Sequence, residues 1–202
     1  MAGEDIQLQT GLLPRRTDRH HSVMHQPGEL LTSGPVALRR WRAADAPAVY
    51  QVVMESLEHL RPWMPWANRY SRDDAVRFTT QSEQDWDAGV AYQYAIATED
   101  AVVGSCGLMR RIGPGGLEIG YWLHPAYTGR GLVTAAVAAL VGEAFALPDI
   151  DRVEIVHDAA NTASGGVPRR LGFTEIERRT RAQGAVAPGE VGIEVVWRLI
   201  RS

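Results

Sequence analysis

The spacing of hydrophobic and polar residues predicts two helices in the first half of the chain. Asp45 and Pro47 suit a helix start, and apolar side chains then recur three and four positions apart from Val49 onward. The prolines within residues 60–66 end this helix, because proline lacks the backbone N–H and restrains the residue before it. The same apolar spacing predicts a second helix from about residue 71 to 86.

Beyond residue 91 the pattern becomes that of short strands with helices between the later ones. The predicted strands are 36–41, 92–98, 102–108, 117–123, 152–156, 173–179 and 194–200. Two further helices are predicted, one from about residue 133 until Pro148 and one at 163–171. Because strands and helices alternate only in the second half, the sequence predicts a mixed α/β (α+β) fold.

The first 28 residues differ from the rest of the chain. They are polar and broken by prolines, which predicts a flexible extension at 1–28 ahead of one domain at 29–202. His20, His21 and His25 could bind a metal, but histidines grouped in such a stretch are usually incidental, so we expect no metal site.

The composition excludes several kinds of chemistry. All 21 basic residues are arginine, so neither the lysine of a Walker phosphate loop nor a Schiff-base lysine is present. The net charge of -3 argues against a nucleic-acid partner, and no apolar run is long enough to cross a membrane. A single cysteine suits a reducing compartment, so we expect a cytoplasmic protein. The usage of Ala, Arg, Gly and Val suggests a bacterial source.

A glycine turn between a strand and a helix is the first candidate site. Gly129 and Gly131 lie just before the predicted helix, whose first N–H groups lack partners and can bind a phosphate. A dinucleotide fingerprint would need a third glycine where Thr134 stands, which argues against NAD or FAD. Taken alone, the turn is equally well interpreted as an ordinary strand–helix connection.

A second segment, residues 161–173, changes the interpretation of the turn. Alone, Asn161 and Ser164 suit helix caps. Together, the two segments resemble the GNAT acyltransferase superfamily, with its Gln/Arg-x-x-Gly-x-Gly/Ala loop and its Asn-x-x-Ser-x-x-Val-x-x-Lys-Leu-Gly-Phe motif. The chain departs from the loop pattern at Thr128 and Val133. Three further segments resemble the RimJ/RimL-type branch, which includes enzymes that acetylate the N-terminal amine of ribosomal proteins: 38–41, 45–47 and 59–66.

This resemblance implies a twisted mixed sheet flanked by helices, with splayed central parallel strands, and acetyl-CoA as the co-substrate. The backbone at 122–124 and the amides at 129–134 would hold the pantetheine and the pyrophosphate, with Arg170 toward the nucleotide. The implied cofactor-binding residues are Trp122, Leu123, His124, Gly129, Arg130, Gly131, Leu132, Val133, Thr134, Asn161, Ser164 and Arg170.

The implied chemistry is direct attack of an amine on the thioester, which needs a base and benefits from an acid. Glu118 is the first candidate base, and His157 with Asp158 is the second. Pro168 stands where the family's tyrosine acid stands, when it has one. Ser164 is therefore the candidate proton donor, with Tyr121 and Tyr127 as alternatives, or else the thiolate leaves unprotonated.

The acceptor side of the predicted site is less defined. The resemblance implies an acceptor pocket that includes Trp66 and Tyr121, whereas we expect Trp63 to belong to the core. The acceptor would be a protein N-terminus or a small amine, and family members are often homodimers. The alternative hypothesis is a non-catalytic module that binds or senses acyl-CoA.

Overall fold

The computed structural model describes residues 25–182, 184 and 186–202. Short 3-10 turns stand at Ala43–Asp45, Pro65–Arg69 and Pro125–Tyr127. The helices and strands follow in the order β1 (Leu30–Ser33), β2 (Val36–Arg40), α1 (Ala46–Leu60), α2 (Arg72–Asp87), β3 (Ala91–Ala97), β4 (Val102–Met109), β5 (Gly116–Leu123), α3 (Leu132–Ala146), β6 (Arg152–Asp158), α4 (Thr162–Arg170), β7 (Thr174–Thr180) and β8 (Ile193–Ile200). The sequence pattern had missed β1, which has only four residues, none of them buried.

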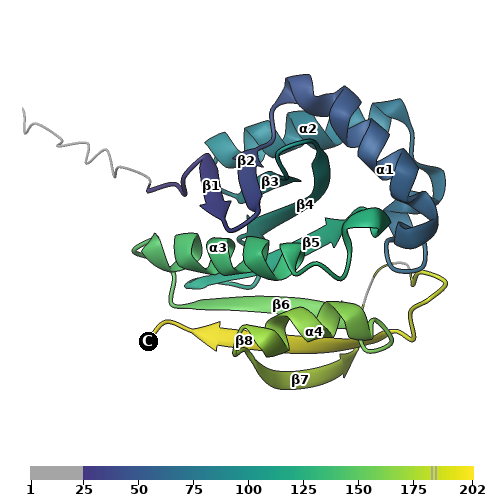
Figure 1. Ribbon diagram of the computed structural model, residues 1–202. Helices are drawn as coiled ribbons and strands as arrows, with labels where there is room; N and C mark the ends of the chain where they lie inside the picture. The colour runs from purple at the N-terminus through teal and green to yellow at the C-terminus, as the bar shows by residue number, and fades with distance from the viewer. Residues whose placement is uncertain (1–24, 183, 185) are drawn as a thin grey trace, which may run out of the picture.

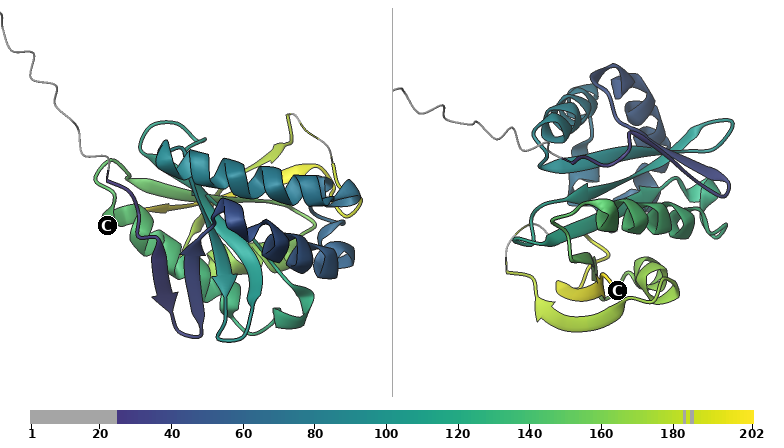
Figure 2. Two further views of the ribbon diagram at one scale, coloured as in Figure 1. Left: turned by 90° about the horizontal axis from the view of Figure 1, so that it is seen from above. Right: turned by 90° about the vertical axis from the view of Figure 1, so that its left-hand side faces the viewer.

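The strands form one sheet in the order β1-β2-β3-β4-β5-β6-β8-β7. Within the described part of the chain, β5 and β6 are the parallel pair and all other neighbours are antiparallel. Helices α1 and α2 cover one face of the sheet, and α3 and α4 cover the other (Figures 1 and 2). The predicted class, a mixed α/β fold with a twisted mixed sheet between helices, is confirmed.

The alternation of side chains along β5 assigns its residues to the two faces of the sheet. Leu117 and Ile119 are buried in the core beneath α3, whereas Trp122 packs with the apolar cluster of α1 and α2. Because successive strand residues point to opposite faces, Tyr121 lies on the α3 side and Glu118 on the α1 and α2 side. This alternation decides which side of the sheet each candidate residue can serve.

Helix α3 is apolar over most of its surface, so its buried face could not be chosen from the sequence. The structure buries one set of its side chains: Leu132, Ala136, Val137, Leu140 and Ala144. The side chains of Val133, Val141 and Phe145 are only partly buried. The helix was predicted from its apolar residues, and the sheet decides which of them it buries.

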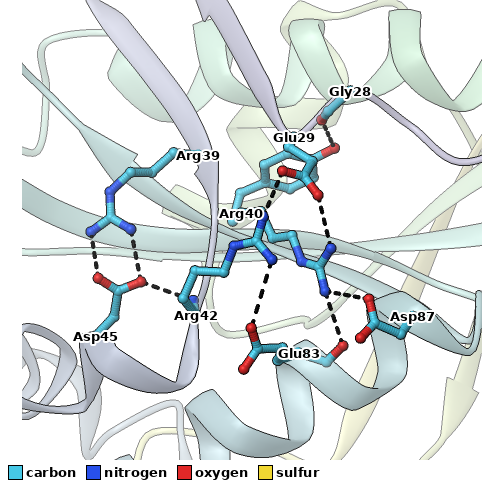
Figure 3. Close-up of polar contacts among 9 residues, drawn as sticks. Gly28, Glu29, Arg39, Arg40, Arg42, Asp45, Glu83 and Asp87 are labelled. Carbon is cyan, nitrogen blue, oxygen red and sulfur yellow. Dashed lines mark hydrogen bonds and ion pairs between the residues drawn. The ribbon is translucent and has the colours of Figure 1, made fainter.

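Ion pairs around Arg40 fix the β1–β2 hairpin to α2 (Figure 3). The buried guanidinium of Arg40 donates to Glu29 (2.9 Å) and Asp87 (2.6 Å). Nearby, Asp45 stands at the position before α1, as predicted, but it does not cap that helix. Its carboxylate instead accepts two hydrogen bonds from Arg39, at 2.8 and 2.9 Å.

The end of the predicted extension contacts the domain. The Gln26 side chain donates to the Trp86 carbonyl oxygen (3.0 Å), and the Tyr94 hydroxyl donates to the Gly28 carbonyl oxygen (2.8 Å). These bonds attach residues 26–28 to α2 and β3. Residues 1–24, which include His20 and His21, lie outside the described residues.

Candidate active site

The parallel strands β5 and β6 separate partway along their length. They pair only from Gly116 to Ile119 and from Arg152 to Ile155, although both strands continue further. Two cavities lie at this opening. The turn cavity, of about 640 Å³, includes the glycine turn 128–134 and the start of α4. The aromatic cavity, of about 570 Å³, includes side chains of α1 and α2. Six residues line both cavities: Trp63, Met64, Tyr121, Trp122, Asn161 and Ser164.

The glycine turn has the properties of an anion-binding site. Gly129 and Gly131 have φ values of 73° and 74°, a conformation that other residues rarely adopt. The first amide of α3 that bonds back is that of Ala135, to the Gly131 carbonyl (3.0 Å). The amides from Gly129 to Thr134 have no acceptor within the described residues. The Arg170 guanidinium donates to the Thr134 hydroxyl (3.1 Å), which adds a positive charge beside this helix start.

The open edge of β5 leads from the turn to the other cavity. Trp122 and Leu123 line the turn cavity, and beyond Ile119 this edge of β5 is not paired with β6. An extended ligand can hydrogen-bond such an edge as an added strand would. The amide of His124 is used elsewhere, because it donates to the Val103 carbonyl (2.7 Å).

The side chains of His124 and Arg130, two residues predicted to bind the cofactor, contact neighbouring residues of the same turn. The Nδ1 of His124 accepts from the Ala126 amide (3.1 Å), and the Arg130 guanidinium lies 5.2 Å from the ring centre of Tyr127. The Arg130 amide is one of the free amides of the turn, and the prediction concerned this backbone group.

Helix α4 brings Asn161 and Ser164 to the opening between the strands. The Asn161 side-chain oxygen accepts from the Ser164 amide (3.1 Å), so Asn161 caps the helix, and its NH₂ group has no partner within the described residues. The Tyr121 hydroxyl donates to the Ser164 carbonyl (2.9 Å) and accepts from the Ser164 hydroxyl (3.2 Å). Burial raises the pKa of Tyr121 to about 12, against the opposing effects of Ser164 and Arg170.

His157 lies on the same face as α4, and both of its ring nitrogens are engaged. Its Nε2 accepts from the Trp197 indole N–H (3.0 Å), which leaves the proton on Nδ1, next to the Asp158 carbonyl (2.7 Å). A Cβ atom at Gly165 would lie 2.7 Å from Nε2, so the ring packs directly against the backbone of α4. This geometry favours a role for His157 in positioning α4 over the role of a base.

The aromatic cavity is walled by side chains of the segment after α1. Trp66 is 44% exposed and lies 6.2 Å from Trp122 and 5.6 Å from Tyr70, measured between ring centroids. Trp66 therefore lines a cavity, as predicted. The expectation that Trp63 belongs to the core is wrong, because Trp63 lines both cavities and is only half-buried. The prolines on either side of it end the regular helix, and the chain continues as the 3-10 turn Pro65–Arg69.

Charged side chains on the α1 and α2 side of the sheet were largely missed by the sequence analysis. Glu118 lines the aromatic cavity, is 13% exposed and forms an ion pair with Arg111. Besides Arg111 and Asp158, four more charged side chains line it: Asp74, Arg181, Glu190 and Glu194. Arg181 and Glu190 form a double hydrogen bond, with both distances 2.8 Å. No sequence signal identified these residues, because their neighbours come from distant strands and loops.

Asp158 anchors the loop that precedes β8. Its buried carboxylate accepts hydrogen bonds from the amides of Ala160 (2.9 Å), Val191 (3.0 Å) and Gly192 (2.8 Å). Burial acts to raise the pKa of Asp158, but these amides and the charge of Arg181 hold it below its ordinary value of 3.8. These three hydrogen bonds give Asp158 a structural role, because they hold the loop before β8 next to the opening between β5 and β6.

We expect Asp158→Asn to lower the free energy of unfolding by about 2–4 kcal/mol, because the new NH₂ group would face an amide donor. Since the folded-state pKa is depressed, this contribution is present above pH 3.8 and is lost as the pH falls below it. Urea unfolding at pH 7 and at about pH 3 measures the difference. An equal difference between the two proteins at both pH values would contradict the assignment.

Two kinds of feature are absent from the described part of the chain. Among the described residues, no three His, Cys, Asp or Glu side chains gather closely enough to hold a metal ion. No helix in the described part of the chain combines the length and the apolar character needed to cross a bilayer.

Comparison with known proteins agrees with this geometry. The family described as acetyltransferase (GNAT) domain matches residues 36–174. YdaF of Bacillus subtilis (strain 168), named as a ribosomal N-acetyltransferase, is 29% identical over 150 residues, or 69% of this chain and 78% of YdaF. The ribosomal-protein-serine acetyltransferase of Escherichia coli (strain K12) is 27% identical over 128 residues, or 62% of this chain and 71% of the relative. The structure of RimL, an acetyltransferase of ribosomal L7/L12, in complex with coenzyme A has a TM-score of 0.77, with 24% identity, 85% of this chain and 98% of RimL covered.

The chain belongs to the GNAT acetyltransferase family. It is an acetyl-CoA-dependent N-acetyltransferase, which confirms the enzyme class and the co-substrate that the two motifs implied. The free amides, the left-handed glycines and the nearby Arg170 fit the pyrophosphate of that co-substrate.

Proposed function

We propose that this enzyme transfers the acetyl group of acetyl-CoA to the primary amine of a protein N-terminus by direct attack. The observation that carries the proposal is the pair of cavities that meet between β5 and β6. Acetyl-CoA enters by the turn cavity and the amine by the aromatic cavity, so the two reactants meet without a covalent enzyme intermediate. The names of the relatives, ribosomal and ribosomal-protein-serine acetyltransferase, support a protein N-terminus over a small amine.

In this proposal the turn cavity holds the coenzyme. The amides at 129–134 bind the pyrophosphate, and Arg170 lies toward the nucleotide. The open edge of β5 at Trp122 and Leu123 binds the pantetheine arm, together with the free NH₂ group of Asn161. Acetyl-CoA supplies an activated acetyl group, and these residues direct it to the opening of the sheet.

The acceptor amine must lose its proton before it attacks. A protein α-amino group has a pKa of about 7.7–8.0, so one carboxylate acting through water gives enough assistance. Glu118 is the proposed base, because it lines the aromatic cavity on the acceptor side of the sheet. The hydroxyl pair of Tyr121 and Ser164 stands at the opening and is the proposed donor toward the leaving sulfur.

The state of Cys106 supports direct attack. This cysteine pairs with Tyr121 across β4 and β5 and is buried. Burial raises the pKa of its thiol, so it remains protonated and is a poor nucleophile. An acetyl-cysteine intermediate is therefore not favoured.

The experiment that tests this function is a panel of acceptors with acetyl-CoA, read as release of free thiol. The panel holds N-terminal peptides, the same peptides with a blocked α-amine, and small amines. We expect turnover with free N-termini and none with blocked ones. Equal rates on small amines would overturn the preference for a protein N-terminus.

The alternative hypothesis, a non-catalytic module that senses acyl-CoA, is not supported, because the chain belongs to the acetyltransferase (GNAT) family and the relatives it matches are named as acetyltransferases. The proposal also includes a homodimer, and light scattering across a range of protein concentrations tests it.

A further inference from the structure

We propose that the side-chain carboxamide of Gln93 donates a hydrogen bond to the first carbonyl group of the acceptor, and so selects a peptide N-terminus over a simple amine. This inference rests on the proposed function, because it takes the aromatic cavity as the place where the acceptor binds. It adds to the site a residue of β3, a strand on which no sequence motif falls. The proposal follows from the free carboxamide of Gln93, from the glycines beside it and from its position relative to Glu118.

Gln93 is a polar side chain in an otherwise apolar row of β3. Its neighbours on the same face of the sheet are the buried Ala91 and Ala95, and Ala95 packs with the apolar cluster of α1 and α2. The Gln93 carboxamide lines the aromatic cavity and has no hydrogen-bond partner within the described residues. Because an unpaired polar group in a half-buried position costs free energy, this carboxamide gains from binding a ligand in the cavity.

Two glycines lower the floor of the cavity beside Gln93. Gly107 of β4 pairs in register with Gln93 on one side and with Gly120 of β5 on the other. A Cβ atom at Gly107 would lie 2.7 Å from the Cδ of Gln93, so the carboxamide lies directly on the Gly107 backbone, while Gly120 lines the cavity. Neither glycine has a positive φ, so the backbone conformation does not require them. Their missing side chains instead leave room for the backbone of a ligand to approach the sheet.

The carboxamide lies at a suitable distance from the proposed base. Glu118 comes two residues before Gly120 on β5, and Gly107 lies across from Gly120 on the next strand. With about 3.4 Å per residue along a strand and about 4.8 Å between strands, the backbone at Gly107 is roughly 8 Å from that at Glu118. One water and the N–Cα–C unit of an amino acid together span about this distance. An amine held near Glu118 through a water therefore brings the carbonyl that follows it to Gln93.

The chemistry of the floor matches a carbonyl group. The first carbonyl of a peptide is an acceptor, so it needs a donor. The polar neighbours of Gln93 on the floor do not supply one, because the Ser105 hydroxyl donates to the Tyr94 carbonyl (3.1 Å) and the Glu118 carboxylate only accepts. The carboxamide of Gln93 has two free N–H groups. Every protein N-terminus has this carbonyl and a simple amine lacks it, so the contact selects a peptide whatever its first side chain is.

Steady-state kinetics of Gln93→Met on two kinds of acceptor test the proposal. Methionine keeps the size of the side chain and has no N–H, so we expect the KM of peptides to rise about tenfold while kcat changes by less than about twofold. Peptides that begin with alanine and with serine should show the same rise. For isopropylamine, which resembles an N-terminal alanine without its carbonyl, kcat/KM should stay the same. Gln84→Met makes the same change at an exposed position of α2 outside both cavities and should alter none of these values.

Gly107→Ala is the second variant, and it serves alone should Gln93→Met fail to fold. It keeps Gln93 but places a Cβ atom where the carboxamide lies. Because the carboxamide ends a flexible side chain, it should move aside without unfolding the sheet, and the KM of peptides should rise as in Gln93→Met.

Three results would overturn the proposal: an unchanged peptide KM in these variants, an equal loss on isopropylamine, or a rise confined to the serine peptide, which would mean that Gln93 binds the first side chain. A wild type that acetylates no peptide would instead reject the proposed acceptor. Calorimetry of the peptide with the complex of enzyme and coenzyme A then decides the assignment. Binding that weakens about tenfold in Gln93→Met supports it. Equal binding in the two proteins, or none, overturns it.

Discussion

An aspartate in place of Gly131 is expected to weaken acetyl-CoA binding by about 100-fold, or about 2.7 kcal/mol. Gly131 stands at the N-cap of α3 with φ 74°, next to the free amides, and a Cβ atom there would meet open space. The new carboxylate would accept from those amides and repel the pyrophosphate, so it would occupy the position of the ligand. Isothermal titration calorimetry with acetyl-CoA measures the change.

Gly34 offers a matched control for this substitution. It also has a positive φ, 55°, and open space around its Cβ position, but it lies in the β1–β2 hairpin. Gly34→Asp should show a similar backbone cost, about 1–2 kcal/mol, with unchanged affinity for acetyl-CoA. Equal affinity in Gly131→Asp and Gly34→Asp would show that the turn is not the anion site.

Glu118→Gln is expected to lower kcat by about 100-fold or more while the dissociation constant of acetyl-CoA stays the same. The substitution keeps the size of the side chain and removes its ability to accept a proton. Because Glu118 lines the aromatic cavity and not the turn cavity, the proposed coenzyme contacts in the turn cavity should remain. Steady-state kinetics on the best peptide of the panel, together with calorimetry, separates the two quantities.

Two variants test whether Glu118 acts as a base or only as the partner of Arg111. Glu154→Gln changes the residue that pairs in register with Glu118 on β6, but Glu154 does not line either cavity, so we expect turnover close to the wild-type rate. Arg111→Met breaks the ion pair and leaves the Glu118 carboxylate in place. If Arg111→Met lowers kcat as much as Glu118→Gln does, the ion pair rather than the base is what matters.

Local signals predicted most of the fold. The start of α2 is an example, because Ser71 accepts from the Asp74 amide and Asp74 bonds back to Ser71, as helix-starting residues do. The strands followed from short apolar runs between turn residues. The pattern failed at β1, where four residues without a buried side chain give no periodic signal. It also failed for Asp45, whose carboxylate binds Arg39 because the tertiary fold brings the two side chains together.

The turn cavity was more predictable than the aromatic cavity. The positive φ values of Gly129 and Gly131 and the side-chain cap formed by Asn161 depend on a few consecutive residues of their own turn or helix. The aromatic cavity depends on pairs far apart in the sequence. Trp63 is an example, since only the packing of α1 and the loop before β8 leaves it at a cavity wall.

By itself the sequence determined the order of the elements from β2 onward, the glycine turn and the cap of α4, because each depends on neighbours within a few residues. Only the tertiary structure decided where β5 and β6 separate, which is after Ile119 and Ile155. It also decided that His157 is held by Trp197, that Glu118 pairs with Arg111, and that Tyr121 reaches Ser164. These contacts join segments from 7 to 43 residues apart. Local propensity carries no information about such pairs, since their geometry is set by the register and the faces of the whole sheet.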